Sequence, residues 1–269
     1  MLAFERGDRA GMAEQVTWSD ARPDDRVFLR TRAWAAAAEG QMQRSRELFN
    51  RIVDDARRRG LKRAIAVTQC ELGSFEAEYG NSQRTVSLTT EALANAPVLL
   101  SAASVMASAG RPRVAQSLVA QWLPSAPPSA PGRFALLPFV NARVQIALGR
   151  LGAALEALRP APMELSDSQG AFGPYQRAIT YLAAKHFDEA IREFTRILDH
   201  HHGVGALTPY YSLAPLQLAR ACSQVGDIDQ ARKQYEVFLT RWKDADADVP
   251  VLVQAKREYS RLTTARVMP

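Results

Sequence analysis

Three consecutive histidines, His200, His201 and His202, are by type the residues of this chain best suited to bind a metal ion. Imidazole nitrogens are common zinc ligands. Successive residues on a helix point about 100° apart, so three in a row cannot all face one ion unless the backbone unwinds. The only other histidine is His186. We interpret the run as a helix C-terminus, where positive charge is favourable, closed by Gly203, and we expect no metal site.

Alternating carboxylates at Asp244, Asp246 and Asp248 form the second pattern with possible chemistry, because calcium-binding loops space acidic residues two apart. Such a loop also needs a glycine at its sixth position and a bidentate glutamate at its twelfth. Val249 and Ala255 occupy these positions. We therefore interpret the segment as a connection that follows a helix.

Motifs of enzymes and nucleotide-binding proteins are missing from the sequence. Gly203-Val-Gly205 begins like a dinucleotide-binding loop, but it follows a predicted helix and lacks the third glycine. The chain has no phosphate-binding Gly-x-x-x-x-Gly-Lys motif, no His-Glu-x-x-His and no Gly-x-Ser-x-Gly. Four histidines, three of them consecutive, offer little for general acid–base catalysis. We expect neither enzymatic activity nor a cofactor.

Basic residues exceed acidic ones, and the formal net charge is +6. The densest basic segment, 57–63, is predicted to end a helix and form the following turn, where cations complement exposed carbonyl groups. A nucleic-acid-binding face would instead collect basic residues with aromatic residues between them. Because the charges here are interleaved with acidic residues, we favour a solvated surface. Nucleic-acid binding stays an alternative.

The elements that would position any site follow from a pattern that recurs six times. An apolar helical stretch ends at a turn, and a second stretch carries a small residue followed four positions later by a bulkier one. The small residue allows two helices to approach closely, and the larger one projects from the same face. This pattern predicts an all-α chain of stacked helix–turn–helix pairs. The six positions are Ser45/Phe49, Thr85/Thr89 (the weakest), Ala115/Val119, Ala154/Leu158, Ala190/Phe194 and Ala231/Tyr235.

Turn signals divide the chain into six predicted helix pairs and a final helix, with nothing typical of a strand. The predicted ranges are Arg26–Glu39 with Gln41–Arg59, Lys62–Tyr79 with Ser82–Asn95, Val98–Ala109 with Pro112–Trp122, Phe134–Leu148 with Leu151–Leu158, Pro174–Lys185 with Phe187–His200, Leu213–Val225 with Asp229–Trp242, and a solvent-facing capping helix Pro250–Leu262.

A proline-rich segment predicts a division of the array. Residues 1–123 form an N-terminal sub-array, 124–132 a stiff linker, and 133–269 a C-terminal sub-array with the final helix. The longest apolar run, Pro97 to Gly110, is too short to span a membrane, and the N-terminus lacks the layout of a signal peptide. Cys70 and Cys222 are too far apart in the array to pair, and we expect both to be buried.

Several residues match the tetratricopeptide-repeat (TPR) pattern. Leu72-Gly73 and Pro97 occupy the Leu-Gly and terminal proline positions of the second pair. The chain thus resembles TPR proteins, which implies a right-handed α-solenoid of about six degenerate helix pairs with a C-terminal capping helix. Further matches in the fifth pair are Ala178, Tyr181, Ala190 and Phe194.

The C-terminal third shows a narrower resemblance. Residues 174–185, 193–200 and 235–246 resemble the repeat region of eukaryotic-like serine/threonine protein kinases of soil bacteria such as Acidobacteria, and of related winged-helix regulators. The chain itself has no kinase module: it lacks the Gly-rich loop with its lysine, His-Arg-Asp and Asp-Phe-Gly. One alternative is therefore that this chain is the sensor or docking region of a kinase whose catalytic domain lies upstream, in a longer protein of which this is a fragment.

The resemblance also indicates where a partner would bind. In TPR arrays the second, fifth, ninth and twelfth residues of the first helix usually line the concave groove. Aromatic residues and arginines suit a peptide interface, and arginine can pair with the carboxylates of an acidic segment. The lysine/asparagine carboxylate clamp of chaperone-binding arrays is absent. The groove residues selected in this way are Arg30, Trp34, Ser74, Phe139, Arg143, Tyr175 and Arg220.

These observations lead to the hypothesis of a non-enzymatic scaffold that binds a partner protein or peptide in bacterial signalling. We expect the chain in the cytoplasm. Because the kinases that it resembles often place such repeats beyond a transmembrane helix, an extracytoplasmic location is the alternative.

Overall fold

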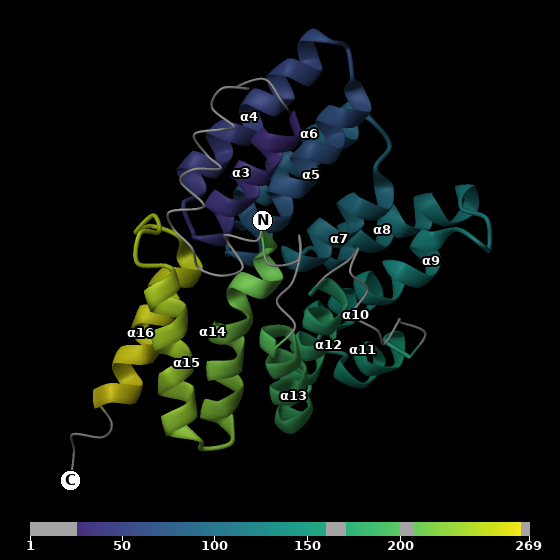
Figure 1. The fold of residues 1–269 in the computed structure, drawn as a ribbon. Coiled ribbons are helices and arrows are strands. Elements are labelled where there is room, and N and C mark those ends of the chain that lie inside the picture. The colour runs from purple at the N-terminus through teal and green to yellow at the C-terminus, as the bar shows by residue number, and fades with distance from the viewer. Residues whose placement is uncertain (1–25, 160–170, 200–206, 265–269) are drawn as a thin grey trace.

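A computed structural model describes residues 26–159, 171–199 and 207–264. These residues form fourteen α-helices and one short 3-10 helix, and they contain no strand, so the predicted all-α class is confirmed (Figure 1). The elements are α3 (Arg26–Ala38), α4 (Met42–Arg58), α5 (Lys62–Glu78), α6 (Ser82–Asn95), α7 (Leu99–Ser108), α8 (Pro112–Trp122), η1 (Leu123–Ser125), α9 (Pro131–Ala135), α10 (Leu137–Ala147), α11 (Leu151–Ala157), α12 (Phe172–Ala183), α13 (Phe187–Asp199), α14 (Pro209–Gln224), α15 (Ile228–Arg241) and α16 (Pro250–Thr264).

Neighbouring helices pack in twos. α3 packs on α4, α5 on α6, α7 on α8, α10 on α11, α12 on α13 and α14 on α15. The first helices of successive twos also contact one another, from α5 through α7, α10 and α12 to α14. From α5 onward, the first helix of each two therefore contacts the first helix of the next.

The six small/bulky positions explain this packing. All twelve residues are buried, and the six small ones have no solvent-exposed surface. At one of them, Ser45 Oγ of α4 donates a hydrogen bond to the carbonyl of Ala33 on α3, at 2.9 Å. The predicted close approach of second to first helices at these positions is confirmed.

Most predicted helix ends lie within one or two residues of the observed ones, and the differences that matter most are at three helix starts. Phe134–Leu148 is two helices, α9 and α10, which meet at Leu136, because Pro138 begins a new helix more easily than it continues one. α12 begins at Phe172, before the predicted Pro174. α14 begins at Pro209 rather than Leu213, since proline suits the first turn of a helix.

Six of the turns inside or between the helix pairs hold a glycine with positive φ, and in the α12–α13 turn this position is occupied by Lys185, with φ 63°. The turn has the hydrogen bonds of a Schellman motif: Lys185 N–H donates to the carbonyl of Leu182 at 3.1 Å, and His186 N–H to that of Tyr181 at 2.9 Å. A side chain in this conformation costs about 1–2 kcal/mol.

Replacing the exposed Lys185 by glycine should therefore raise the free energy of unfolding by about 0.5–1 kcal/mol, after the greater chain entropy of glycine is subtracted. Urea denaturation measures the change. The matched control is Lys233→Gly in the interior of α15, where the same substitution should destabilise by about 1 kcal/mol. Equal signs for the two variants would contradict the conformational explanation.

The end of α15 and the start of α16 contact the first two helix pairs (Figure 1). Trp242 Nε1 donates to the carbonyl of Ala38 at 3.0 Å, and Asp246 N–H donates to the carbonyl of Gly40 at 3.1 Å. Val251 N–H donates to the carbonyl of Tyr79 at 3.1 Å. In addition, α14 packs against α3 and α5. We refer to the interaction of residues 242–251 with the α3–α4 and α5–α6 turns as the closure contact.

This contact adds a buried face to the helix that was expected to face solvent at the C-terminal end; Gln254, Lys256 and Arg257 on its other side are exposed. Val251, Leu252 and Ala255 of α16 are buried, and Pro250 lies close to Gly80. The amphipathic pattern of α16 indicates a buried face, but it does not identify the remote turn against which that face packs.

The hydrophobic core combines residues that precede the segment 124–132 with residues that follow it. One cluster combines residues of α3–α5 with residues of α12–α16, and a second combines α5–α8 with Val140 and Val144 of α10. Arg133 donates to the carbonyls of Leu123 and Ala126, which fixes the segment against η1. The division into sub-arrays 1–123 and 133–269 stays a prediction. In the part of the chain that the structure describes, no helix is both long and apolar enough to cross a membrane.

Candidate binding site

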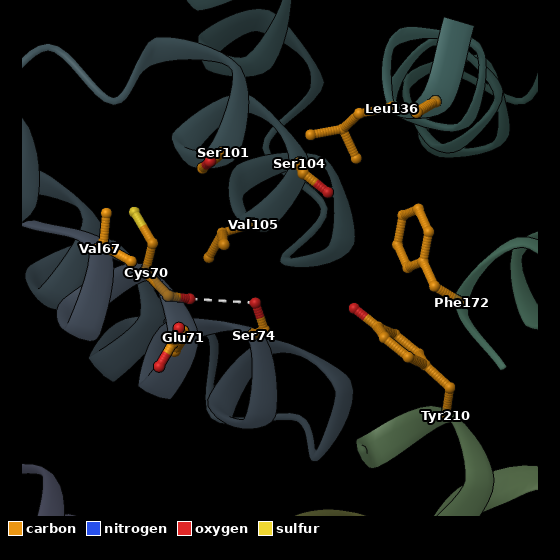
Figure 2. Close-up of a pocket in the computed structure, with 11 residues that line it drawn as sticks. Val67, Cys70, Glu71, Ser74, Ser101, Ser104, Val105, Leu136, Phe172 and Tyr210 are labelled. Carbon is orange, nitrogen blue, oxygen red and sulfur yellow. Dashed lines mark hydrogen bonds between the residues drawn. The ribbon is translucent and has the colours of Figure 1, made fainter. Parts of the chain in front are cut away.

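A cavity of about 380 Å³ lies among the first helices of the pairs (Figure 2). Its wall combines hydroxyl, carboxylate and thiol groups with aliphatic and aromatic side chains. The lining residues are Val67, Cys70, Glu71 and Ser74 of α5, Ser101, Ser104 and Val105 of α7, Ala135 and Leu136 at the α9–α10 junction, Phe172 of α12 and Tyr210 of α14.

Helical spacing produces this wall. The four α5 residues lie three and four positions apart, as do the three α7 residues, so each set forms one helix face. Serine and cysteine are small, which leaves space between the two faces. Phe172 and Tyr210 project from the opposite side, from the first turns of α12 and α14, and the Tyr210 hydroxyl points toward the cavity (Figure 2).

Glu71 is the one charged residue of the described cavity wall. Its Oε1 forms an ion pair with Arg30, and the distance between Oε1 and Arg30 Nη2 is 2.7 Å. In contrast, Oε2 is shielded from solvent and has no hydrogen-bond partner among the described residues. Burial raises the pKa of Glu71 from 4.5 to about 7, and the charge of Arg30 opposes the increase. The carboxyl group therefore titrates near neutral pH.

The other titratable groups of the wall stay neutral. Burial raises the pKa of the Cys70 thiol to about 12, so it is a poor nucleophile at neutral pH. Burial likewise raises the pKa of Tyr210. Ser74 donates its hydroxyl to the carbonyl of Cys70, at 3.0 Å. The site can bind a ligand by hydrogen bonding and apolar contact, and these groups do not form a nucleophile–base arrangement.

A pH-dependent stability difference should follow from Glu71. Since its folded-state pKa exceeds the unfolded value, the folded chain retains a proton that the unfolded chain loses, and stability falls as the pH rises from 4.5 to about 7. Glu71→Gln removes this loss, so the variant should gain about 1–3 kcal/mol relative to the wild type across that window. Urea denaturation across this pH range measures it. Exposed Glu47→Gln is the control, and parallel curves for wild type and Glu71→Gln would contradict the assignment.

Three of the predicted groove residues lie at or near the cavity. Ser74 lines it, and Arg30 approaches it through the ion pair with Glu71. The Arg30 guanidinium also lies over the Trp34 ring, 4.9 Å from its centroid, and its side chain is 48% exposed. Trp34, Arg30 and Glu71 therefore connect α3 to α5 beside the cavity.

Phe139 and Tyr175 require a correction, because they are not available to a ligand. Their exposed fractions are 2% and 0%. Phe139 contacts Phe172, Phe172 contacts Tyr210, and Tyr210 contacts Tyr175, each pair with ring centroids 5.2 Å apart. The two predicted anchors therefore form the layer behind the aromatic wall. The groove-position spacing selected residues on first helices, but it did not show that other aromatic side chains cover Phe139 and Tyr175.

Arg143 and Arg220 already have carboxylate partners within the chain. Arg143 Nη2 lies 2.6 Å from Glu78 Oε1, and Arg143 also donates to the side-chain oxygen of Gln176. Arg220 donates to both carboxylate oxygens of Glu258, at 2.9 and 3.1 Å. These pairs connect helices, so an acidic ligand would have to displace an internal carboxylate from either arginine.

The sequence reasoning missed Glu71, Phe172 and Tyr210. Glu71 precedes the matched Leu72-Gly73, and its spacing from Ser74 was a usable signal. Phe172 and Tyr210 fell outside the predicted helices, because both lie in first turns whose starting residues were placed too late.

The segments first considered for chemistry contribute differently. Asp246 Oδ2 accepts a hydrogen bond from Gln43 N–H at 2.7 Å, so this carboxylate takes part in the closure contact. The His200–His202 run and Gly203–Gly205 lie outside the described residues. Among the residues that the structure describes, no group of three or more histidine, cysteine, aspartate or glutamate side chains is placed to hold a metal ion. In the basic segment, Arg57 pairs with Asp54, and Arg58 and Arg59 pair with Asp55, which is consistent with a solvated face.

Comparison of the sequence with models of known protein families gives no match, and comparison with curated proteins gives no significant similarity. The TPR resemblance therefore depends on the sequence positions given above.

Proposed function

We propose that the protein is a non-enzymatic binding module of the TPR type, a solenoid of about six helix pairs that receives a peptide segment of a partner protein. The observation that supports this proposal is the cavity on the first-helix faces of α5 and α7. First helices form the ligand-binding face of TPR arrays, so the cavity lies where the resemblance implies a groove. Participation in cytoplasmic bacterial signalling belongs to the same proposal, and a role as the sensor or docking region of a serine/threonine kinase is the alternative to it.

The dimensions and construction of the cavity favour a short segment. A volume of about 380 Å³ falls within the range typical of small-ligand pockets and is too small for a folded domain. The lining residues come from five helices or their junctions, and the aromatic wall is supported from behind by Phe139 and Tyr175. A preformed site reduces the ordering cost of binding.

A random peptide library displayed on phage tests the proposal. Wild-type protein should enrich a common motif, and Ser104→Phe, whose new ring would fill the cavity, should lose it. In Figure 2 the Ser104 hydroxyl is directed toward the cavity. The matched control is Ser117→Phe on the exposed side of α8, which should enrich the same motif as the wild type. Identical enrichment by all three proteins would show that the cavity is not the binding site.

A further inference from the structure

The cavity wall is rich in hydrogen-bond acceptors and poor in positive charge. It contains the Glu71 carboxylate and the hydroxyl oxygens of Ser74, Ser104 and Tyr210. No lysine, arginine or histidine belongs to the described lining, although the chain as a whole has a net charge of +6. The one charged group of the described lining is therefore a carboxylate, and its basic partner Arg30 contacts it from outside the lining.

Arg30 occupies only part of the hydrogen-bonding capacity of the Glu71 carboxylate. It contacts Oε1 from the side of α3, and its own side chain is half exposed and stacked on Trp34. A carboxylate has about four acceptor positions on its two oxygens. Oε2 has no partner among the described residues but is shielded from solvent, so a ligand in the cavity would have to displace the side chains that cover this oxygen in order to bond to it.

Aromatic rings face the α5 side of the cavity. Phe172 and Tyr210 form an edge-to-face pair with an interplanar angle of 66°. Aromatic faces carry partial negative charge and attract cations at short range. An anionic ligand would meet the Glu71 carboxylate on one side and these rings on the other, with no basic residue of the described wall to compensate it.

From this combination we propose that the cavity recognises an organic cation, an ammonium or guanidinium group on a short apolar body, with Glu71 as its hydrogen-bond acceptor and counter-charge. The inference rests on the proposed function where the cation is a lysine or arginine side chain of a bound peptide. A free amine has the same chemistry, and the experiment separates the two sources. Recognition of a cation is the opposite of the acidic partner expected from the sequence. That expectation came from arginines such as Arg143 and Arg220, which are paired with carboxylates inside the chain.

Three probes of matched shape test the charge preference: 2-phenylethylamine, 2-phenylethanol and 3-phenylpropionate. Binding is measured by ligand-observed NMR at about pH 8, where Glu71, with its pKa of about 7, is mostly ionised. A charge-assisted hydrogen bond should give the amine a Kd about tenfold lower than that of the alcohol. The propionate should bind more weakly than either.

Variants assign the preference to the cavity. Glu71→Gln should reduce the advantage of the amine about tenfold, whereas Glu47→Gln, on an exposed position of α4, should leave it unchanged. Ser104→Phe should abolish binding of the amine, and Ser101→Phe at the exposed rim offers a second blocking variant with little risk to folding. Equal binding of amine and alcohol, tighter binding of the propionate, or no binding of any probe would overturn the inference.

A second pair of outcomes distinguishes this inference from the proposed function. The peptides Ac-Gly-Lys-Gly-NH2 and Ac-Gly-Glu-Gly-NH2 are titrated in parallel with the phage selection. If the selected cavity-dependent peptides lack basic residues and the glutamate peptide binds better, the cation inference is wrong and peptide binding stands. If 2-phenylethylamine binds through Glu71 and no peptide does, the cation inference stands and the peptide proposal is wrong.

Discussion

Replacement of Trp242 by alanine should lower the free energy of unfolding by about 3–5 kcal/mol, because it removes a large, fully buried side chain. The ring contacts Tyr79 and Phe238, with centroids 4.9 and 4.8 Å away, and its Nε1 bonds to the Ala38 carbonyl. Chemical denaturation measures the loss. Small-angle X-ray scattering shows whether the variant remains compact.

Two glycine variants separate the closure contact from general destabilisation. Gly40 and Gly226 both have positive φ, 76° and 81°, so alanine strains the backbone at either position. A Cβ at Gly40 would lie 2.6 Å from Ala245 Cβ and 2.8 Å from the Trp242 ring, whereas at Gly226 it meets nothing within 4 Å. Gly40→Ala should therefore be the more damaging change. Equal losses for the two, together with a small loss for Trp242→Ala, would show that the closure contact is open in solution.

Replacement of Arg143 by methionine should cost about 3–5 kcal/mol, since it leaves the buried Glu78 carboxylate without its partner. The side chains of Arg143 and Glu78 are 14% and 6% exposed. The pair joins α10 to α5, and Gln176 extends the contact to α12. Equilibrium urea denaturation gives the change.

The control is Arg57→Met, which breaks an exposed pair with Asp54 and should cost less than about 1 kcal/mol. A double variant, Glu78→Leu with Arg143→Met, removes both buried charges and should recover part of the loss. A single-variant loss no greater than that of Arg57→Met would contradict the buried ion pair. Because Arg143 belongs to this internal ion pair and Tyr175 is fully buried, variants of either residue report on stability and cannot test ligand binding.

Local features were predictable, and remote contacts were not. Ser82–Asn95 and Pro112–Trp122 were predicted to the residue, because turn glycines, prolines and apolar periodicity are encoded locally. Burial at the small/bulky positions followed from the same periodicity. The meeting of Trp242 with Ala38 was not predictable, since about 200 residues separate them and no local pattern specifies which turn an aromatic side chain reaches.

The candidate site shows the same difference. Ser74, which was selected from helical spacing alone, lines the cavity. Spacing does not show that Arg143 has Glu78 and Arg220 has Glu258 as partners, and these pairs decide whether an arginine is free to bind. Helical spacing also does not show how deeply a side chain is buried. Phe139 and Tyr175 occupy inward positions, but other aromatic rings cover them.

The closure contact also limits how this kind of chain can change in length. Repeat arrays commonly gain or lose units by duplication and deletion, because each unit contacts only its neighbours. Here an additional helix pair would move Trp242 away from Ala38 and Pro250 away from Gly80, and every inserted unit would have to be compensated by a change in curvature elsewhere. Among the described residues, an added helix pair between α5 and α15 would therefore have to preserve these contacts, whereas substitutions within pairs leave them in place.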